Sequence, residues 1–410
     1  MRSIILVGCG DHGRRILSPS LTRLEETGEL EVVGLVDTQA AALRQLESTF
    51  PKARQFVRKT RQGLPELISE LGTAAPVAIL AHDHDWHARD AADLLQAGVS
   101  VVVEKPYAVS SDEVTVVKRM TRSYPERIVL AEYYAFMKAA PLFHAAGLLN
   151  GESFYYTRSG HLEGPQGNRL RPLAIPPLDS IGAIRLVYCD ILEGEGETGR
   201  VDHRGRHFAD SRAGIGMILD LGIHALAILT ALRSRIGQFA ADAVHSARAA
   251  QARQLVDHAA RKFKVPSAYV PESYAETTLY SDRGVLAAVA VGKYILSDRN
   301  QRRLILVGDE GMGFLDMSSC AFSLAVGDGS LETICRSPKD ASSKYVAVLR
   351  ACLAILDNRS PFLFDPTESA LRSNELCLRV LDLARIHGFA STGFETGSRP
   401  RDVFELGGTV

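Results

Sequence analysis

Neither sign of charge predominates in this sequence of 410 residues, which has 47 lysines and arginines against 48 aspartates and glutamates. Proteins that bind nucleic acid or an anionic membrane surface through their overall charge carry a basic surplus. The formal net charge of −1 therefore predicts neither kind of partner. The six cysteines are scattered without a CxxC pair. This spacing excludes a local zinc ribbon or dithiol motif and is typical of reduced thiols in an intracellular protein.

A long apolar run is also missing. The most apolar stretch, residues 216–229, is shorter than a membrane-spanning helix and contains Asp220 and His224. The start of the chain has no basic segment followed by an apolar run, as a signal peptide requires. We therefore expect a cytoplasmic protein with no membrane partner.

The first third of the chain alternates apolar runs with segments of helical composition. Such alternation predicts a doubly wound parallel sheet, the Rossmann architecture of an α/β protein, over residues 1–135. The apolar runs lie at residues 4–7, 32–36, 77–81, 99–103 and 128–131, and the helical segments at 14–26, 38–49, 86–96 and 110–122.

Residues 136–410 have a different pattern, in which strands follow one another with few intervening helices. This order predicts an α+β domain with a large, mostly antiparallel open sheet. We further expect residues 247–263 to form a surface helix and Arg299, Arg302 and Arg303 to lie on a solvated sheet edge. The predicted strands are 184–191, 274–280, 285–295, 303–307 and 314–317, followed by helices at 344–356 and 368–385.

The first functional motif is the glycine turn Gly8-Cys9-Gly10-Asp11-His12-Gly13, which follows an apolar strand and precedes a helix. Glycines in this context let backbone amides approach the pyrophosphate of a dinucleotide. Asp37 ends the second strand, where a carboxylate accepts hydrogen bonds from a ribose diol and favours NAD. NADP is the alternative, with Arg14, Arg15 or Arg44 near enough in sequence to hold its phosphate. The other interpretation is an ordinary glycine turn with an unrelated aspartate.

The second motif, Glu104-Lys105-Pro106, follows a buried strand, at the end where parallel sheets bind ligands. An ammonium group there can donate to a substrate oxygen and favour its alkoxide. The alternative is a strand end at which Lys105 pairs with Glu104 or is solvated.

The third motif, Asp220-Leu221-Gly222-Ile223-His224, places a carboxylate and an imidazole four residues apart in an apolar segment. On a helix both side chains lie on one face. They form either a buried structural pair or a histidine acid/base supported by an aspartate.

A fourth cluster, His82-Asp83-His84-Asp85-Trp86-His87, contains potential metal ligands. Alternation along an extended segment argues against their convergence, so we expect no metal site.

Together these motifs resemble the Gfo/Idh/MocA family, the group of glucose–fructose oxidoreductase and inositol dehydrogenase. The Glu-Lys-Pro segment is similar to the family's aGkhVlvEKP motif, and the aspartate–histidine segment to its GGGxxxDxGxH motif. The resemblance spans most of the chain and is carried by residues 8–13, 97–106, 133–136, 179–184, 214–224 and 303–311.

The resemblance implies a Rossmann domain (1–135) followed by a substrate-binding and oligomerisation domain (136–410). An open sheet in the second domain often forms the dimer face in this family, so we expect a homodimer or homotetramer. The resemblance also implies that Lys105, Asp220 and His224 meet at the nicotinamide. His224 is then the acid/base, Lys105 polarises the reacting oxygen, and Asp220 is the partner of His224 or a substrate ligand.

Three departures from the family pattern stand out. The usual Thr-Pro-Asn-x-x-His becomes residues 82–87, of which only His87 matches. The usual asparagine–arginine–phenylalanine segment becomes residues 133–136, without the cationic residue. Residues 150–178 and 247–272 look like insertions.

We therefore predict an NAD-dependent (alternatively NADP-dependent) oxidoreductase. It transfers a hydride between nicotinamide and a secondary hydroxyl or ketone of a sugar, cyclitol or related small polyol. The alternatives are an imine or other C=N or C=C reductase of the same family, a non-catalytic cofactor-bound sensor or scaffold, and a metal-dependent hydrolase that uses residues 82–87. The predicted catalytic residues are Lys105, Asp220 and His224; the cofactor contacts are Gly8, Gly10, Asp11, His12, Gly13, Asp37, His82, His87, Glu104 and Lys105; and the substrate contacts are Tyr133, Tyr134, Lys105, Asp220 and His224.

Overall fold

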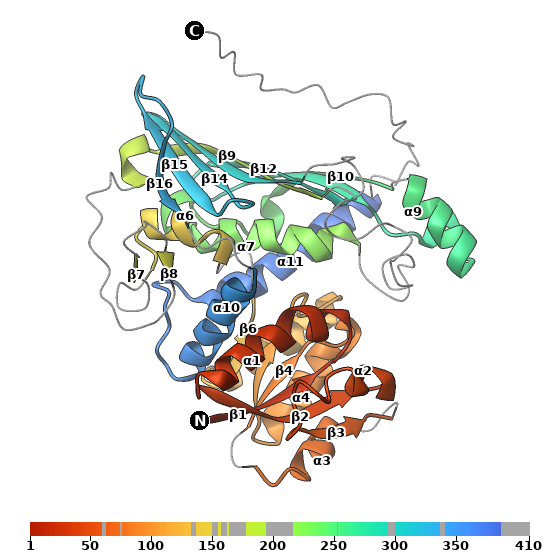
Figure 1. Ribbon diagram of the computed structural model, residues 1–410. Helices are drawn as coiled ribbons and strands as arrows, with labels where there is room; N and C mark the ends of the chain where they lie inside the picture. Colours follow the sequence, from red (N-terminus) through yellow and green to blue (C-terminus); the bar gives the residue numbers. More distant parts are fainter. Residues whose placement is uncertain are drawn as a thin grey trace.

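The computed structural model contains two main sheets, one parallel and one mostly antiparallel, with helices between them (Figure 1). The predicted fold class is confirmed. The predicted boundary between residues 135 and 136 lies outside the described residues. Residues described by the structure are 1–59, 63–73, 76–132, 137–149, 155–156, 162–163, 178–193, 216–251, 253–293, 300–336 and 341–386.

The N-terminal sheet has six parallel strands in the order β3-β2-β1-β4-β5-β6. Its central strands are buried apolar runs, because helices cover both faces of the sheet. The order in which the strands follow one another reverses between the neighbouring strands β1 and β4. At such a point the carboxyl ends of the strands form the crevice in which parallel sheets bind ligands. The strands are β1 (Arg2–Val7), β2 (Leu30–Asp37), β3 (Arg54–Val57), β4 (Val77–Leu80), β5 (Ser100–Val103) and β6 (Ile128–Leu130).

The helices of this domain connect successive strands. After the glycine turn, a widened helical turn, η1, continues directly into α1. Ser110 caps α5, since its hydroxyl accepts a hydrogen bond from the Glu113 amide. The helices are η1 (Gly13–Leu17), α1 (Ser18–Glu26), α2 (Ala40–Arg44), α3 (Leu64–Ser69), η2 (His84–Trp86), α4 (His87–Gln96) and α5 (Ser111–Ser123).

The second sheet has eight strands in the order β10-β11-β12-β9-β13-β14-β15-β16. Only the β9–β12 pair is parallel. On β9, Val187, Cys189 and Ile191 are buried, while the alternate Tyr188 is partly exposed, as expected for a sheet covered on one face. The strands are β9 (Ile184–Glu193), β10 (Val244–Ala250), β11 (Tyr274–Tyr280), β12 (Leu286–Lys293), β13 (Gln301–Gly308), β14 (Gly311–Asp316), β15 (Ala321–Val326) and β16 (Glu332–Arg336); β7 (Tyr155–Tyr156) and β8 (Leu162–Glu163) form a separate pair.

Helices α7 and α11 lie between the second sheet and the Rossmann domain (Figure 1). Asp220 and His224 belong to the helical segment formed by η7 and α7, which is buried on all sides. The remaining helices are α6 (Ala140–Ala145), η4 (Leu178–Ile181), η7 (Ile218–Gly222), α7 (Ile223–Ala231), α8 (Arg233–Ile236), η8 (Ala241–Ala243), α9 (Arg253–His258), η9 (Ala259–Phe263), η10 (Ser267–Tyr269), α10 (Ala341–Leu356) and α11 (Pro366–Ile386).

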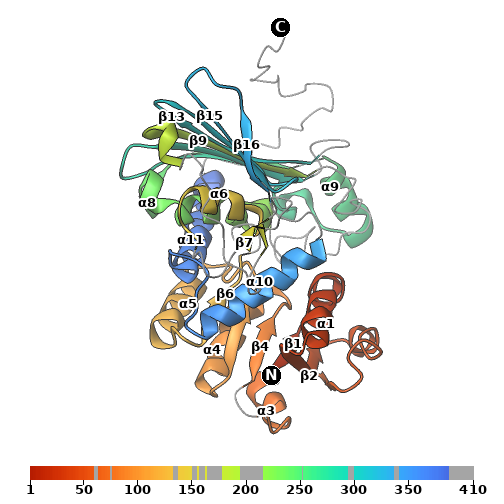
Figure 2. The ribbon, with the colours of Figure 1, turned by 60° about the vertical axis from the view of Figure 1, so that its left-hand side comes forward.

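The C-terminal helices α10 and α11 also contact the Rossmann domain. Helix α10 packs against α1, and α11 packs against α5 and β6 (Figure 2). Arg350 on α10 forms an ion pair with Glu29, at 2.5 Å. The two domains are therefore joined by helices from the end of the chain as well as by the segment after β6.

Two predictions about the second domain are wrong. The predicted helix at 247–263 begins as strand β10, because its alanine-rich backbone pairs with β11, and becomes helical only from Arg253. Arg302 and Arg303 do not lie on a sheet edge, since β13 is hydrogen-bonded to both β9 and β14. The third arginine of that cluster, Arg299, lies outside the described residues. In the described part of the chain no helix is long and apolar enough to cross a membrane.

Candidate active site

Two of the three glycines in the glycine turn are required by the packing of the surrounding backbone, and the third is not. Gly8 has φ +98°, and a Cβ there would lie 2.5 Å from backbone atoms of Ala81 and His82. A Cβ on Gly13 would lie 2.1 Å from the Gly8 carbonyl oxygen. By contrast, no described atom lies within 4 Å of a Cβ built on Gly10. The turn therefore leaves an open cradle of backbone at Gly10, which fits the close approach of a dinucleotide pyrophosphate.

Asp37, at the end of β2, is fixed beside this turn. Its Oδ2 accepts a hydrogen bond from the Cys9 amide at 2.7 Å, and its Oδ1 accepts one from the Gln39 amide at 2.8 Å. A carboxylate has about four acceptor positions, so hydrogen-bonding capacity remains for a ribose diol. Asp11 is exposed and lies near Arg14 and Arg15, at 3.4 and 3.5 Å.

Glu104 follows β5 and lies across the crevice from the glycine turn. Its Oε1 lies 3.7 Å from Nε2 of His12. Burial by itself would raise the pKa of Glu104, but His12, Lys105 and His87 hold it below its usual value. The His12 ring also meets Tyr345 of α10 edge to face, at 5.9 Å between centroids. This part of the site therefore includes a residue of the C-terminal helices.

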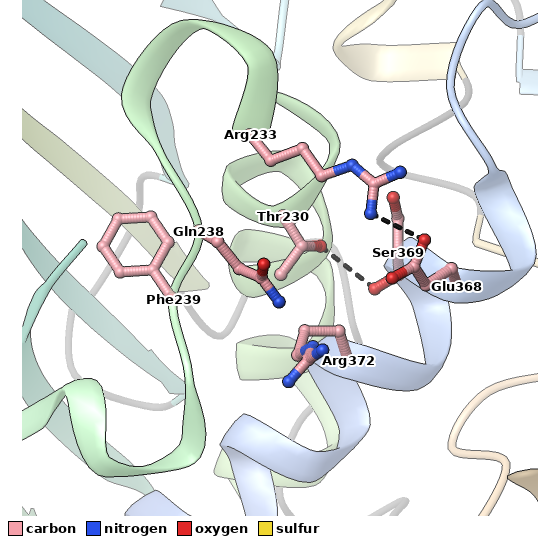
Figure 3. Close-up of a pocket in the computed structure, with 7 residues that line it drawn as sticks. All are labelled: Thr230, Arg233, Gln238, Phe239, Glu368, Ser369 and Arg372. Carbon is pink, nitrogen blue, oxygen red and sulfur yellow. Dashed lines mark hydrogen bonds and ion pairs between the residues drawn. The ribbon is translucent and has the colours of Figure 1, made fainter. Parts of the chain in front are cut away.

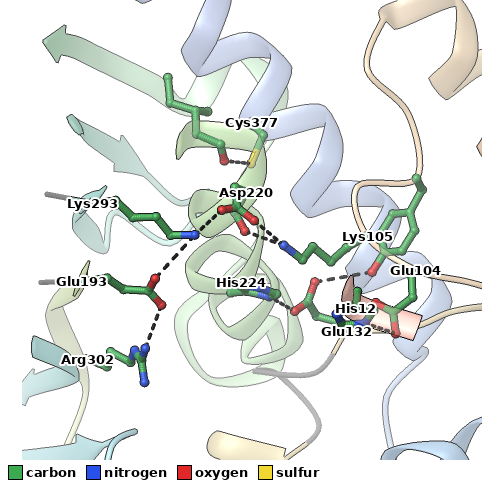
Figure 4. Close-up of polar contacts among 12 residues, drawn as sticks. His12, Glu104, Lys105, Glu132, Glu193, Asp220, His224, Lys293, Arg302 and Cys377 are labelled. Atoms are coloured by element: carbon green, nitrogen blue, oxygen red, sulfur yellow. Dashed lines mark hydrogen bonds and ion pairs between the residues drawn. The ribbon is translucent and has the colours of Figure 1, made fainter. Parts of the chain in front are cut away.

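Lys105 reaches from the Rossmann domain to the second domain. Its Nζ donates to Asp220 Oδ1 at 2.6 Å and to the Asp220 carbonyl oxygen at 3.0 Å (Figure 4). Burial opposes the charged form, but the Asp220 carboxylate raises the pKa of Lys105 above its usual value. Lys105 therefore pairs with Asp220 rather than with Glu104, and it carries a positive charge.

Asn374 on α11 binds the backbone of the loop after Lys105. The Lys105–Pro106 peptide bond is cis. Asn374 on α11 accepts hydrogen bonds from the amides of Tyr107 and Ala108, each at 3.0 Å, and donates to the Ala108 carbonyl oxygen at 2.9 Å. Because Asn374 is fully buried, these bonds are shielded from water and fix where the Lys105 backbone emerges.

Asp220 has two lysine partners. Lys293, the last residue of β12, donates to Asp220 Oδ2 at 2.5 Å, while Lys105 holds Oδ1. Burial would raise the pKa of Asp220, but the two ammonium groups hold it well below its usual value. Asp220 is therefore a carboxylate, and its hydrogen bonds go to lysines rather than to His224.

His224 is paired with Glu132, the second residue after β6. Its Nδ1 contacts Glu132 Oε1, and both side chains are almost completely buried (Figure 4). Tyr107 donates to the Ala131 carbonyl oxygen at 2.7 Å and lies 3.4 Å from Glu132 Oε2. Burial lowers the pKa of His224, and the Glu132 carboxylate opposes this effect in part. The imidazole is therefore neutral at neutral pH and has a fixed orientation.

The residues at 82–87 do not converge. His82 Nε2 donates to Asp90 Oδ2 at 2.6 Å, and Arg58 forms a two-pronged ion pair with the same carboxylate. His87 is buried, and its ring nitrogens lie 2.9 Å and 3.1 Å from the carbonyl oxygens of Pro106 and His82. Burial lowers the pKa of His87 to about 4. Among the described residues no group of three such side chains could hold a metal ion.

The structure thus joins Lys105 to Asp220 and places His224 one turn after Asp220 on the same helical segment. That these three residues act at a nicotinamide, as the resemblance implies, stays a prediction. Sequence reasoning missed Glu132 and Lys293. Lys293 could have been found as the lone lysine in a predicted apolar strand. Glu132 could have been found as a carboxylate that directly follows a buried strand. Tyr133 and Tyr134 lie outside the described residues, and the cofactor roles of His82 and His87 stay predictions.

A shallow pocket between α7, α8 and α11 is separate from this cluster (Figure 3). Arg233 forms an ion pair with Glu368 at 2.6 Å, and the Thr230 hydroxyl donates to the Ser369 carbonyl oxygen at 3.0 Å. None of the residues that line this pocket belongs to the predicted site.

Comparison with known families identifies the N-terminal domain. Residues 2–132 match the model of an oxidoreductase family with an NAD-binding Rossmann fold. This part of the chain is therefore an NAD-binding Rossmann domain of the oxidoreductase type. The matching model is that of the Gfo/Idh/MocA family, so the resemblance of the motifs is confirmed over residues 2–132. No curated protein matches the sequence.

Solved structures share the fold of nearly the whole chain. An oxidoreductase from Thermotoga maritima is 15% identical with a TM-score of 0.66, over 93% of this chain and 96% of that chain. KijD10, a 3-ketoreductase from Actinomadura kijaniata solved with NADP and TDP-benzene, is 16% identical with a TM-score of 0.63, over 93% and 97%. UDP-N-acetylglucosamine 3-dehydrogenase GnnA from Acidithiobacillus ferrooxidans is 15% identical with a TM-score of 0.62, over 94% and 98%.

Proposed function

We propose that this protein is an NAD(P)-dependent dehydrogenase or reductase acting on a secondary hydroxyl or ketone of a sugar, cyclitol or related polyol. One observation carries the proposal. A protonated lysine, Lys105, and a neutral histidine, His224, each with its own buried carboxylate, lie together at the crevice of an NAD-binding domain. A carbonyl–alcohol interconversion needs this pair of groups, one to stabilise the oxygen and one to move its proton.

The dinucleotide would be held by the amides of the glycine turn and by Asp37. The carboxylate of Asp37 accepts hydroxyl donors and repels a phosphate at the same place, so we propose NAD as the preferred cofactor. When bound, the nicotinamide supplies or accepts the hydride. Glu104, buried beside the turn, is a further candidate contact.

Lys105 would bind the reacting oxygen. An ammonium group has three N–H donors, and among the described residues two of them are directed to Asp220. The third can donate to a substrate oxygen and stabilise its negative charge as the alkoxide forms. Because Asp220 is anionic and buried, Lys105 stays protonated while it does so.

His224 would transfer the hydroxyl proton. Since a carboxylate only accepts hydrogen bonds, Nδ1 donates to Glu132 and Nε2 becomes the basic nitrogen. In the oxidation direction, Nε2 takes the proton from the alcohol, and in reduction it returns it. Glu132 stabilises the imidazolium that forms in between, so it is a positioning residue for His224.

The substrate class rests on the chemistry of the site and on two structural neighbours, the 3-ketoreductase and the UDP-N-acetylglucosamine 3-dehydrogenase. A site with ammonium, imidazole and carboxylate groups suits a ligand with several hydroxyls. Loss of one hydroxyl would leave a buried polar group unpaired, at a cost of about 1–3 kcal/mol.

We also propose a homodimer or homotetramer formed through the second sheet. Tyr188, Ile305 and Phe314 stand in one cross-strand row and are partly exposed, on the face opposite the buried residues of β9. Helices α7 and α11 lie on the other face (Figure 1).

The test is a turnover screen that follows reduced nicotinamide with sugars, cyclitols, their phosphates and deoxy analogues, each with NAD and NADP. Lys105→Ala and His224→Ala should each lose turnover by about 10²–10⁴-fold while still binding dinucleotide. His245→Ala, which removes an exposed histidine on β10, is the matched control. Undiminished turnover in His224→Ala would refute the assignment of the proton transfer, and equal turnover of simple aliphatic alcohols would refute the polyol pocket.

A further inference from the structure

The buried charges of the site continue beyond the motif residues, into the second sheet. Lys293 contacts Asp220 Oδ2 at 2.5 Å and lies 3.5 Å from Glu193 Oε2. Glu193 in turn accepts a hydrogen bond from Arg302 Nη2 at 2.8 Å. Figure 4 shows an unbroken series of contacts from Arg302 through Glu193, Lys293 and Asp220 to Lys105. The signs of the charges alternate along this series.

The strand register explains why these residues meet. Glu193 and Lys293 end the parallel strands β9 and β12 and are directly opposite each other. Both side chains point to the covered face of the sheet, where they are 4% and 7% exposed. A buried ion pair is a costly way to stabilise a fold, because apolar residues of similar volume often serve better. A contact with Asp220 gives this pair a role that apolar residues cannot take.

We propose that Lys293 is a positioning residue that acts on the reaction through Asp220. It holds one carboxylate oxygen, so that Lys105 is bound by the other, and its charge sets how readily Lys105 and His224 carry a proton. The proposal rests on the proposed function for its kinetic consequence. Without Lys293, both oxygens of Asp220 would be available to Lys105 and would hold its ammonium away from the substrate.

The charged groups around His224 come from five elements. Glu132, after β6, contacts its Nδ1, and Lys105, after β5, lowers its pKa. Asp220, one turn earlier on its own helix, raises it. Lys293 is linked to this group through Asp220, and Glu193 partly neutralises Lys293. The Glu104 carboxylate also raises the pKa of Lys105. Removing Lys293 therefore makes the net charge of these residues more negative, and removing the charge of Glu193 makes it more positive.

The experiment compares the pH dependence of turnover in four variants. Lys293→Met makes the site more negative, so the limb of the pH profile that belongs to His224 should move to higher pH, by on the order of one pH unit. Glu193→Gln makes the site more positive and should move the limb to lower pH by a smaller amount. The double variant should return toward wild type, and Lys293→Arg, which keeps the charge, should restore the limb. In Lys293→Met, kcat should fall while the dinucleotide KM stays the same.

The same titration without substrate separates the two proposals. Nuclear magnetic resonance of protein with isotope-labelled histidine reports the pKa of His224, assigned by its absence in His224→Gln. If no polyol is turned over but the pKa of His224 shifts in opposite directions in the two single variants, the proposed function fails and the charge coupling stands. If wild type is active and neither variant moves the limb or the pKa, Lys293 is merely structural and the inference is overturned. The inference is also overturned if all the variants lose turnover and the pKa of His224 does not shift in opposite directions in Lys293→Met and Glu193→Gln.

Discussion

Alanine substitutions in the glycine turn should separate folding from dinucleotide binding. Gly10 is not among the glycines with positive φ, and no described atom lies within 4 Å of the position that its Cβ would take. Gly10→Ala should therefore leave the free energy of unfolding unchanged or raise it, by about 0.4–1 kcal/mol through the stiffer unfolded chain. The added methyl group occupies the cradle, so dinucleotide affinity should fall at least tenfold, or about 1.4 kcal/mol.

Gly13→Ala is the matched control, with the opposite result. Its Cβ would lie 2.1 Å from the Gly8 carbonyl oxygen, and backbone must move to relieve the overlap. Overpacking of this kind costs about 1–3 kcal/mol, so Gly13→Ala should unfold at lower denaturant concentration than wild type.

Urea unfolding measures the stability of each variant, and the fluorescence of bound reduced nicotinamide measures its affinity. A Gly10→Ala protein that binds the dinucleotide as tightly as wild type would refute the placement of the pyrophosphate over Gly10. A Gly10→Ala protein as unstable as Gly13→Ala would contradict the open space at this glycine.

Three further predictions concern single side chains. Asp37→Ala should weaken NAD binding and shift the cofactor preference toward NADP, with Asp37→Asn as the control that keeps the shape of the side chain. Equal NAD affinities of wild type and Asp37→Ala would show that Asp37 does not bind the ribose. Glu132→Gln should lower kcat by less than His224→Ala does, while dinucleotide binding is retained, because the imidazole loses its orienting charge; unchanged kinetics would show that His224 needs no such partner. His87 is neutral in the folded protein and its pKa is lowered from 6.5 to about 4 by burial, so it is protonated first in the unfolded chain. The contribution of His87 to the free energy of unfolding should be present above pH 6.5 and disappear as the pH falls toward 4, a change of up to about 3 kcal/mol. Urea unfolding measured across this pH range should show the change in wild type and not in His87→Gln.

The Rossmann domain could be predicted because its signals are local. Buried parallel strands are continuous apolar runs, and the turn after the first strand needs its glycines within a few residues of one another. The predicted strands at 4–7 and 274–280 correspond closely to β1 and β11. The strands β3, β10, β15 and β16 were not predicted, because partners in the sheet rather than their own composition hold them extended.

The sequence by itself determined which side chains can carry the chemistry: Lys105 after a buried strand, Asp220 and His224 within an apolar segment, and Asp37 after the second strand. Only the tertiary structure decided how they pair. Asp220 binds Lys105, 115 residues away, and Lys293, 73 residues away, and His224 binds Glu132, 92 residues away. Periodicity indicates which face of an element is buried, but it cannot say which charge from another element will lie against it. In a region with little water each buried charge must meet a partner, and the packing of α7 between the two sheets selected these partners.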